Sequence, residues 1–179
     1  MNKKTLNNEL ERLTVEEFKA EEKTPLIVIL DNIRSLANIG SVFRTGDAFR
    51  IEKVYLCGYT AQPPHREIQK TALGASKSVA WEHREDIFGL MDELLNERVE
   101  IYSIEQTSDA IMLNDFEPKK GIRTAVVFGN EVQGVQQEVI DKSTGVIEIP
   151  QIGTKHSLNI SVSNGVVLWD LYAKLMKKN

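Results

Sequence analysis

The stretch TAVVFGNE at residues 124–131 decides the fold of this 179-residue chain. Its first five residues are apolar or β-branched and show no polar alternation, which is typical of a parallel strand covered on both faces. Gly129 follows where this strand ends, and a glycine there lets the backbone approach a ligand closely. The stretch therefore predicts a buried parallel strand that leads into a binding loop.

Other short apolar runs alternate with helical patterns on both sides of this stretch. The runs predict strands at 26–30, 53–57, 78–81, 99–104 and 146–149. The patterns between them predict helices at 38–49, 66–73, 85–97, 134–142 and 158–177. This alternation predicts an α/β fold with a mainly parallel sheet of about six strands flanked by helices. Ligands in such sheets bind beyond the carboxyl ends of the strands.

The first 23 residues differ from the rest because they are polar with scattered leucines. Thr14 with Glu17 three residues later matches a capping box, which predicts a short helix over 15–22. We expect two parts, a helical appendage at 1–23 and the α/β domain at 24–179. Whether the appendage docks on the core or on a partner stays open.

The composition excludes several classes of protein. Hydrophobic residues make up 41% and charged residues 27%, which is ordinary for a globular chain. The single cysteine, Cys57, lies in an apolar run, so we expect a buried hydrophobe and no disulfide. No run approaches the roughly 20 apolar residues of a membrane span, and the first residues lack the apolar segment of a signal peptide. We expect a soluble cytoplasmic protein.

Positive charge is concentrated in one part of an acidic chain. The net charge is −4, yet residues 32–84 hold eight Lys and Arg against four acids. Such a segment permits local binding of phosphate groups. A solvated surface with chance clustering explains it equally well, so the charge alone does not identify a partner.

Polar and small residues follow three of the predicted strands, where an α/β site is expected. In 31–45, Asn38 is a candidate N-cap and Arg44 lies two turns into the helix. In 128–135, Gly129 precedes Asn and Glu. In 149–164, Ser157 is a candidate N-cap for the last helix. Polar residues within that helix need partners if buried, which suggests a packed loop or a ligand nearby.

Several common sites are excluded by the same residues. Gly129 and Gly134 have phosphate-loop spacing, but Val135 and Gln136 replace the required Lys and Ser/Thr. The dinucleotide fingerprint GxGxxG is absent. Three histidines and one cysteine show no metal-ligand spacing, so we expect no metal site. His156 beside Ser157 does not make a hydrolase pair, because GxSxG is absent.

Together, in order and spacing, the three segments resemble the signature motifs of the SpoU (TrmH-like) family of RNA 2′-O-ribose methyltransferases, within the SPOUT class. The matching features are an Asn, a Gly and Arg-Thr in the first segment, and Phe-Gly-x-Glu in the second. The third segment has Ile-Pro, a Gly and Ser-Leu-Asn-x-Ser-Val. The resemblance extends over about residues 25–175.

The resemblance implies a cofactor and an unusual topology. Family members fold their carboxyl-terminal part into a trefoil knot, which runs against general rules of topology and rests on the resemblance alone. Loops at 104–107, 129–134 and 149–158 would hold a bent S-adenosylmethionine. The expected backbone contacts are at Ile104, Gly129, Ile149 and Leu158.

The resemblance also implies catalytic residues, centred on Arg44. A guanidinium stays charged and has no acceptor atom, which makes it a poor base, so we expect Arg44 to anchor the RNA and stabilise negative charge. Asn38 and Asn159 would hold Arg44 and the substrate backbone. Glu131 would orient an arginine or contact RNA, and Ser157 would fix the third loop.

The implied partners are RNA and a second copy of the chain. We expect Arg34, Arg66 and Lys70 to contact RNA phosphates, although a surface loop without a partner explains Arg66 and Lys70 equally well. No separate RNA-binding domain is evident, which favours tRNA over rRNA. The last helix, 158–177, is apolar nearly all round, which predicts a homodimer through it, although the appendage offers another cover. Two alternatives stay open, a non-catalytic RNA-binding or scaffold protein and a methyltransferase of small molecules.

Overall fold

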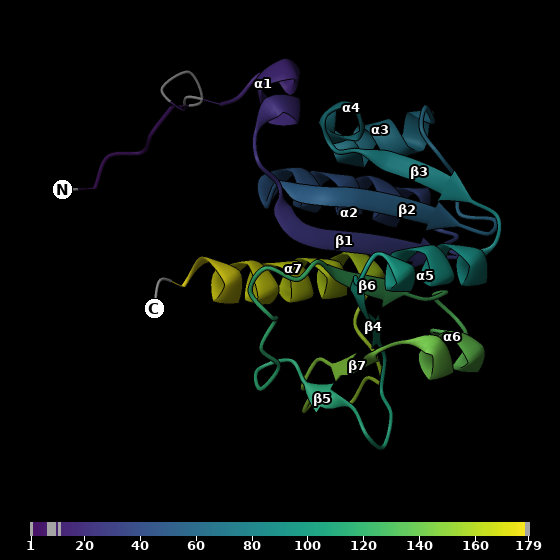
Figure 1. Cartoon of the computed structure of the whole chain (residues 1–179). Helices are drawn as coiled ribbons and strands as arrows, with labels where there is room; N and C mark the ends of the chain where they lie inside the picture. Colours follow the sequence, from purple (N-terminus) through teal and green to yellow (C-terminus); the bar gives the residue numbers. More distant parts are fainter. Residues whose placement is uncertain (1, 7–9, 11, 178–179) are drawn as a thin grey trace.

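The computed structural model describes residues 2–6, 10 and 12–177, so the predictions for residues 1, 7–9, 11 and 178–179 lie outside the described residues. Its elements (Figure 1) are α1 Val15–Ala20, β1 Thr24–Asp31, α2 Leu36–Ala48, β2 Ile51–Cys57, α3 Arg66–Ala72, α4 Ala75–Ser78, β3 Trp81–Arg84, α5 Ile87–Asn96, β4 Glu100–Ile104, β5 Ile111–Met112, β6 Thr124–Phe128, α6 Gln137–Lys142, β7 Gly145–Glu148 and α7 Ile160–Met176.

The strands form one parallel sheet, as the sequence predicts. Their order is β3-β2-β1-β6-β4-β7-β5, which Figure 1 shows from top to bottom. The sheet has seven strands where about six are predicted, because β5 has only two residues and leaves no periodic signal. The strand predicted at 78–81 is misplaced, since Ser78 ends α4 and β3 begins at Trp81.

Helices cover both faces of the sheet, and β1 supplies side chains to each side. Leu26, Val28 and Leu30 pack into a core with α2 and α7. Ile27 and Ile29 alternate with them and pack against α5 and α6. This double burial explains why β1 is continuously apolar, with no polar alternation.

Two helices begin at residues other than those predicted. The N-cap of α2 is Ser35 and not Asn38, because the Ser35 hydroxyl accepts the Asn38 N–H at 3.3 Å. The N-cap of α7 is Asn159 and not Ser157, because the Asn159 side chain accepts the Ser161 N–H at 2.9 Å. Each observed N-cap thus lies two or three positions from the predicted one. The side-chain amides of Asn38 and Asn159 also bond to each other, as described below.

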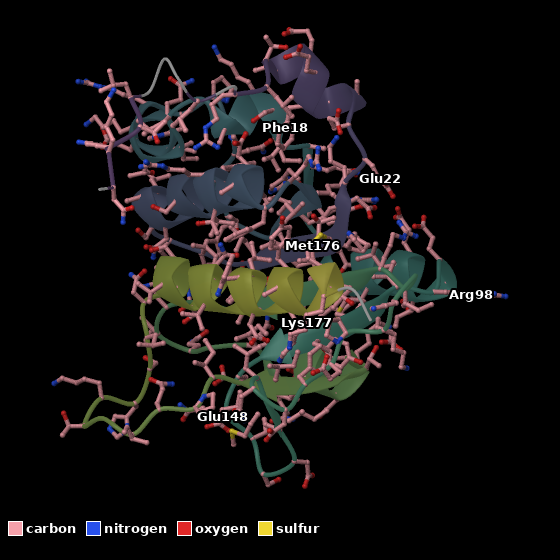
Figure 2. All side chains as sticks on the ribbon, turned by 90° about the vertical axis from the view of Figure 1, so that its left-hand side faces the viewer. Phe18, Glu22, Arg98, Glu148, Met176 and Lys177 are labelled. Carbon is pink, nitrogen blue, oxygen red and sulfur yellow. The ribbon has the colours of Figure 1, made fainter. Side chains whose placement is uncertain are left out.

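The N-terminal helix α1 docks on the α/β core. The capping box of Thr14 and Glu17 is confirmed. Phe18 is buried and belongs to the same core cluster as β1 and α7, and Figure 2 shows it on the side of α1 that faces the body of the protein. The division into an appendage and a domain stays a prediction, and so does the trefoil knot.

The last helix, α7, is apolar on two sides. Val167, Leu168 and Leu171 are fully buried against the sheet. Val162 and Trp169, in contrast, expose 50% and 58% of their surface. Nothing in the described part of the chain covers this second side. Among the same residues, no helix is long and apolar enough to cross a membrane.

One polar residue on the buried side of α7 has no partner. Asn164 is fully buried, and neither its Oδ1 nor its Nδ2 atom has a hydrogen-bond partner among the described residues. An unsatisfied buried amide destabilises a fold by about 1–3 kcal/mol.

We predict that Asn164→Leu, which keeps the approximate volume of the side chain, raises the free energy of unfolding by about 1–3 kcal/mol. Urea unfolding followed by circular dichroism measures it. Asn164→Asp, which retains a polar group and adds a charge, is the matched control and is expected to destabilise. A leucine variant less stable than wild type would show that this amide has a partner in solution.

Candidate functional site

A cavity of about 700 Å³ opens at the carboxyl ends of β4, β6 and β7. Its walls are the loops that follow β4, β6 and β7. All four predicted cofactor contacts line it: Ile104, Gly129, Ile149 and Leu158. A second cavity of about 740 Å³ lies between α1 and the ends of α2 and α7. None of the predicted site residues lines the second cavity, so the first is the candidate site.

Glu131 fastens the loop after β6 to the start of α2. Its carboxylate accepts the backbone N–H groups of Arg34 and Ser35, each at 3.0 Å. It also accepts the side-chain amide of Asn38 at 3.4 Å. The partners are therefore backbone groups and an amide, where the sequence predicts an arginine side chain or RNA.

These contacts determine the protonation of Glu131. Partial burial acts to raise the pKa of this carboxyl group, but the N–H groups of Arg34 and Ser35 outweigh burial, and the pKa lies below its ordinary value of 4.5. The start of α2 also carries a partial positive charge, which favours an anion there. Glu131 is thus ionised at neutral pH.

Asn38 and Asn159 join the first segment to the third. The amide of Asn159 donates to Asn38 Oδ1 at 3.2 Å, while Asn38 itself donates to Glu131. Three of the five predicted catalytic residues therefore form one hydrogen-bonded chain across the three segments. In this chain Asn159 bonds to Asn38 and Asn38 bonds to Glu131, and neither asparagine has a hydrogen bond to the side chain of Arg44.

The other two predicted catalytic residues make no such contact. Arg44 is exposed on α2 and does not line the cavity, and its side chain has no hydrogen bond or ion pair within the described residues. Ser157 lines the cavity, and its side chain is exposed and without a described hydrogen bond. The single chain therefore does not bring Arg44 to the cavity.

Asn130 is a functional candidate that the sequence reasoning missed. Its side chain is buried and donates to the Asn32 carbonyl at 2.9 Å and to the Tyr59 hydroxyl at 2.6 Å. Its Oδ1 accepts the N–H groups of Val132 and Gln133. Asn130 thus shapes the loop after β6 and ties it to the ends of β1 and β2. Its position between Gly129 and Glu131 was the available signal.

Two neighbouring residues after β4, Glu105 and Gln106, lie in the predicted cofactor loop 104–107 but were not named as site residues. Glu105 accepts the Val135 N–H at 3.0 Å, and Gln106 donates to the His156 carbonyl at 2.8 Å. Both residues line the cavity. The sequence offers no local signal for them, because their partners lie 30 and 50 residues further along the chain.

Ion pairs within the chain neutralise half of the cations in the basic segment at residues 32–84. Ion pairs engage four of its eight cations: Arg50, Lys53, Lys70 and Arg84. The other four form no ion pair within the described residues: Arg34, Arg44, Arg66 and Lys77. Among the predicted RNA contacts, Arg34 and Arg66 are exposed with free charges, whereas Lys70 pairs with Glu67 at 2.7 Å.

Other reactive side chains make no second site. Burial raises the pKa of the Cys57 thiol to about 12, so Cys57 is the buried hydrophobe that the sequence predicts. In the described ranges, no group of three or more His, Cys, Asp or Glu side chains could hold a metal ion. The cavity itself is lined by backbone groups, amides, hydroxyls, carboxylates and the imidazole of His156.

Known proteins resemble this chain over nearly all of its length. It is 31% identical over 177 residues to an uncharacterized tRNA/rRNA methyltransferase of Borreliella burgdorferi, covering 97% of this chain and 74% of the relative. It is 28% identical over 169 residues to the tRNA (guanosine(18)-2′-O)-methyltransferase of Thermus thermophilus, covering 94% and 85%.

The fold also matches solved structures. The AdoMet-bound rRNA methyltransferase of Sinorhizobium meliloti superposes with a TM-score of 0.80 at 20% identity, over 89% of this chain and 61% of that one. The model of the SpoU rRNA Methylase family matches residues 25–169, which include all three polar segments and every wall of the cavity. The chain therefore belongs to the SpoU family of RNA methyltransferases.

Proposed function

We propose that this protein transfers a methyl group from S-adenosylmethionine to a ribose 2′-hydroxyl of structured RNA, with tRNA favoured over rRNA. The observation that carries the proposal is the convergence of the three motif segments. The loops of the second and third segments, together with the loop after β4, form the walls of one cavity. Hydrogen bonds among Glu131, Asn38 and Asn159 join the first segment to these two. The similarity to a tRNA 2′-O-methyltransferase supports the choice of tRNA.

The cavity fits the proposed cofactor. Its volume of about 700 Å³ lies within the roughly 300–1,000 Å³ of small-molecule sites. Apolar side chains such as Ile104 and Leu158 suit the faces of an adenine ring, and backbone groups at the strand ends suit its polar edge. Ser157 adds a polar group for the ribose or the amino-acid part. When bound, S-adenosylmethionine supplies an electrophilic methyl group on a positively charged sulfur.

Transfer to a ribose hydroxyl requires a fixed geometry and a means of stabilising the oxygen as its proton leaves. In this proposal Arg44 supplies a permanent positive charge near the ribose or its phosphate. Arg44 is exposed and has no partner in the described chain, so its guanidinium is available to RNA. Because a guanidinium keeps its charge, Arg44 acts as an electrostatic stabiliser and not as the proton acceptor.

A homodimer through α7 is part of this proposal. The exposed apolar side of α7 requires a cover, and the appendage helix α1 leaves it open. Since α2 packs against α7, a partner subunit on α7 would lie next to the helix that carries Arg44. The dimer interface and the reacting groups are then neighbours.

Arg34 and Arg66 are the cations best suited to phosphate. Both are exposed and unpaired within the described residues, and they lie on the loop before α2 and at the start of α3. Lys70 is a weaker candidate because Glu67 already neutralises it. A cytoplasmic location follows from this substrate and stays a prediction.

We predict that a strain lacking this protein loses 2′-O-methylation at a defined tRNA position, and that wild-type protein restores it. Arg44→Lys keeps the charge but loses the planar guanidinium, and we expect methylation at least about tenfold slower in purified protein. Sequencing that detects 2′-O-methyl groups in total tRNA and rRNA identifies the site. No lost methyl group, together with no binding of S-adenosylmethionine by calorimetry, would support the non-catalytic alternative.

We predict that Glu131→Gln changes how stability depends on pH. The folded-state pKa of Glu131 lies below its ordinary value, so its ionisation stabilises the fold above about pH 4.5, and this contribution is lost as the pH falls through the folded-state pKa. The difference in stability between wild type and variant should therefore be largest at neutral pH and shrink in acid. Urea unfolding between pH 3 and pH 7 tests it, and a difference independent of pH would contradict it.

We predict that Val166→Asp disrupts the dimer, because Val166 lies on the exposed side of α7 and a carboxylate cannot be buried there without a partner. Sedimentation should show a dimer for wild type and a monomer for the variant at micromolar concentration. Val132→Asp changes an equally apolar and more exposed residue away from α7, and this control should remain a dimer.

A further inference from the structure

The residues after β4 contact both opposite walls of the cofactor cavity. Glu105 bonds to the loop after β6 through the Val135 N–H at 3.0 Å. Gln106, its neighbour, bonds to the loop after β7 through the His156 carbonyl at 2.8 Å. The second carboxylate oxygen of Glu105 accepts the Gln106 N–H at 2.9 Å, which joins the two contacts.

The loop after β6 is shaped around the Glu105 carboxylate. Gly134 has a φ of +70°, and a Cβ atom there would lie 2.2 Å from Glu105 Oε2. The Gly134 N–H bonds back to the Asn130 carbonyl at 2.8 Å, which closes the loop. The carboxylate therefore occupies the space that any other residue at position 134 would need.

The loop after β7 depends on Gln106 in another way. Every residue from 152 to 159 is exposed, so packing contributes little to holding this loop. For residues 151–158, the bond from Gln106 to His156 is the one hydrogen bond that the described residues make. Figure 2 shows the loop extending away from the body of the protein, beyond Glu148 and before α7.

We propose that Glu105 and Gln106 are positioning residues that hold the two outer walls of the cofactor site at a fixed separation. Gln106 anchors the exposed loop 151–158, and Glu105 fixes the loop 129–135. The identity of the ligand rests on the proposed function. A wall that is already ordered costs less entropy on binding, so loss of either anchor weakens cofactor affinity without altering the groups that react.

The two anchors can be separated by experiment, because Lys155 offers a trypsin site within the loop that Gln106 holds. Gln106→Ala removes the donor, and Gln106→Glu keeps the shape but places a carboxylate against the His156 carbonyl. We expect both to raise trypsin cleavage after Lys155 by about tenfold, the equivalent of one hydrogen bond. Glu105→Gln acts on the other wall and should leave that rate unchanged.

All three variants should raise the dissociation constant of S-adenosylmethionine by about tenfold in calorimetry, again the equivalent of one hydrogen bond. The melting temperature should stay close to wild type, because Gln106 is exposed and Glu105 half-buried. In turnover, KM for the cofactor should rise while kcat at saturating cofactor is kept. Glu85→Gln removes an exposed carboxylate outside the site and is the matched control.

Wild-type rates of cleavage after Lys155 in both Gln106 variants would overturn the anchoring role. A fall in melting temperature and kcat, with KM unchanged, would overturn the positioning role in favour of a structural one. Failure of wild-type protein to bind S-adenosylmethionine would overturn the proposed function and the cofactor part of this inference. In that case the cleavage rates still test whether Gln106 anchors the loop 151–158, because they are measured on the protein without cofactor.

Discussion

The parallel pairing of β1 with β6 is the constraint on which the rest of the structure depends. It sets Leu30 opposite Phe128, so the two strands end at the same level and the segments that follow them meet. Glu131 can then accept N–H groups 96 and 97 residues earlier in the chain. Because β4 and β7 continue the same sheet, their loops open onto the same edge. The site is a consequence of strand register.

Much of the fold could be predicted from the sequence, since buried parallel strands carry a clear apolar signal. The errors have local causes. A two-residue strand such as β5 has no period, and the strand predicted at 78–81 began too early because Ser78 ends the short helix α4. The N-caps were wrong because a run with Ser35 and Asn38, or Ser157 and Asn159, offers two capping side chains, and tertiary contacts choose between them.

The site, like the fold, has residues that could be predicted from the sequence and residues that could not. The residues of the three motifs could be named because they follow strand ends, and the structure gathers Glu131, Asn38 and Asn159. Glu105 and Gln106 could not be named as site residues from the sequence, because a side chain that bonds to a distant backbone group leaves no pattern in the residues around it. Arg44 is the opposite case: its motif identifies it as a site residue, but its side chain has no partner in the described part of the chain.

The state of Cys57 makes this protein convenient for labelling. The only thiol in the sequence is fully buried, and its raised pKa leaves almost no thiolate at neutral pH. Maleimide and iodoacetamide reagents should therefore leave the native chain unmodified. A single cysteine introduced on the surface would carry a fluorophore or spin label without first removing a native one. With two introduced cysteines, the distance between a loop and a helix becomes measurable.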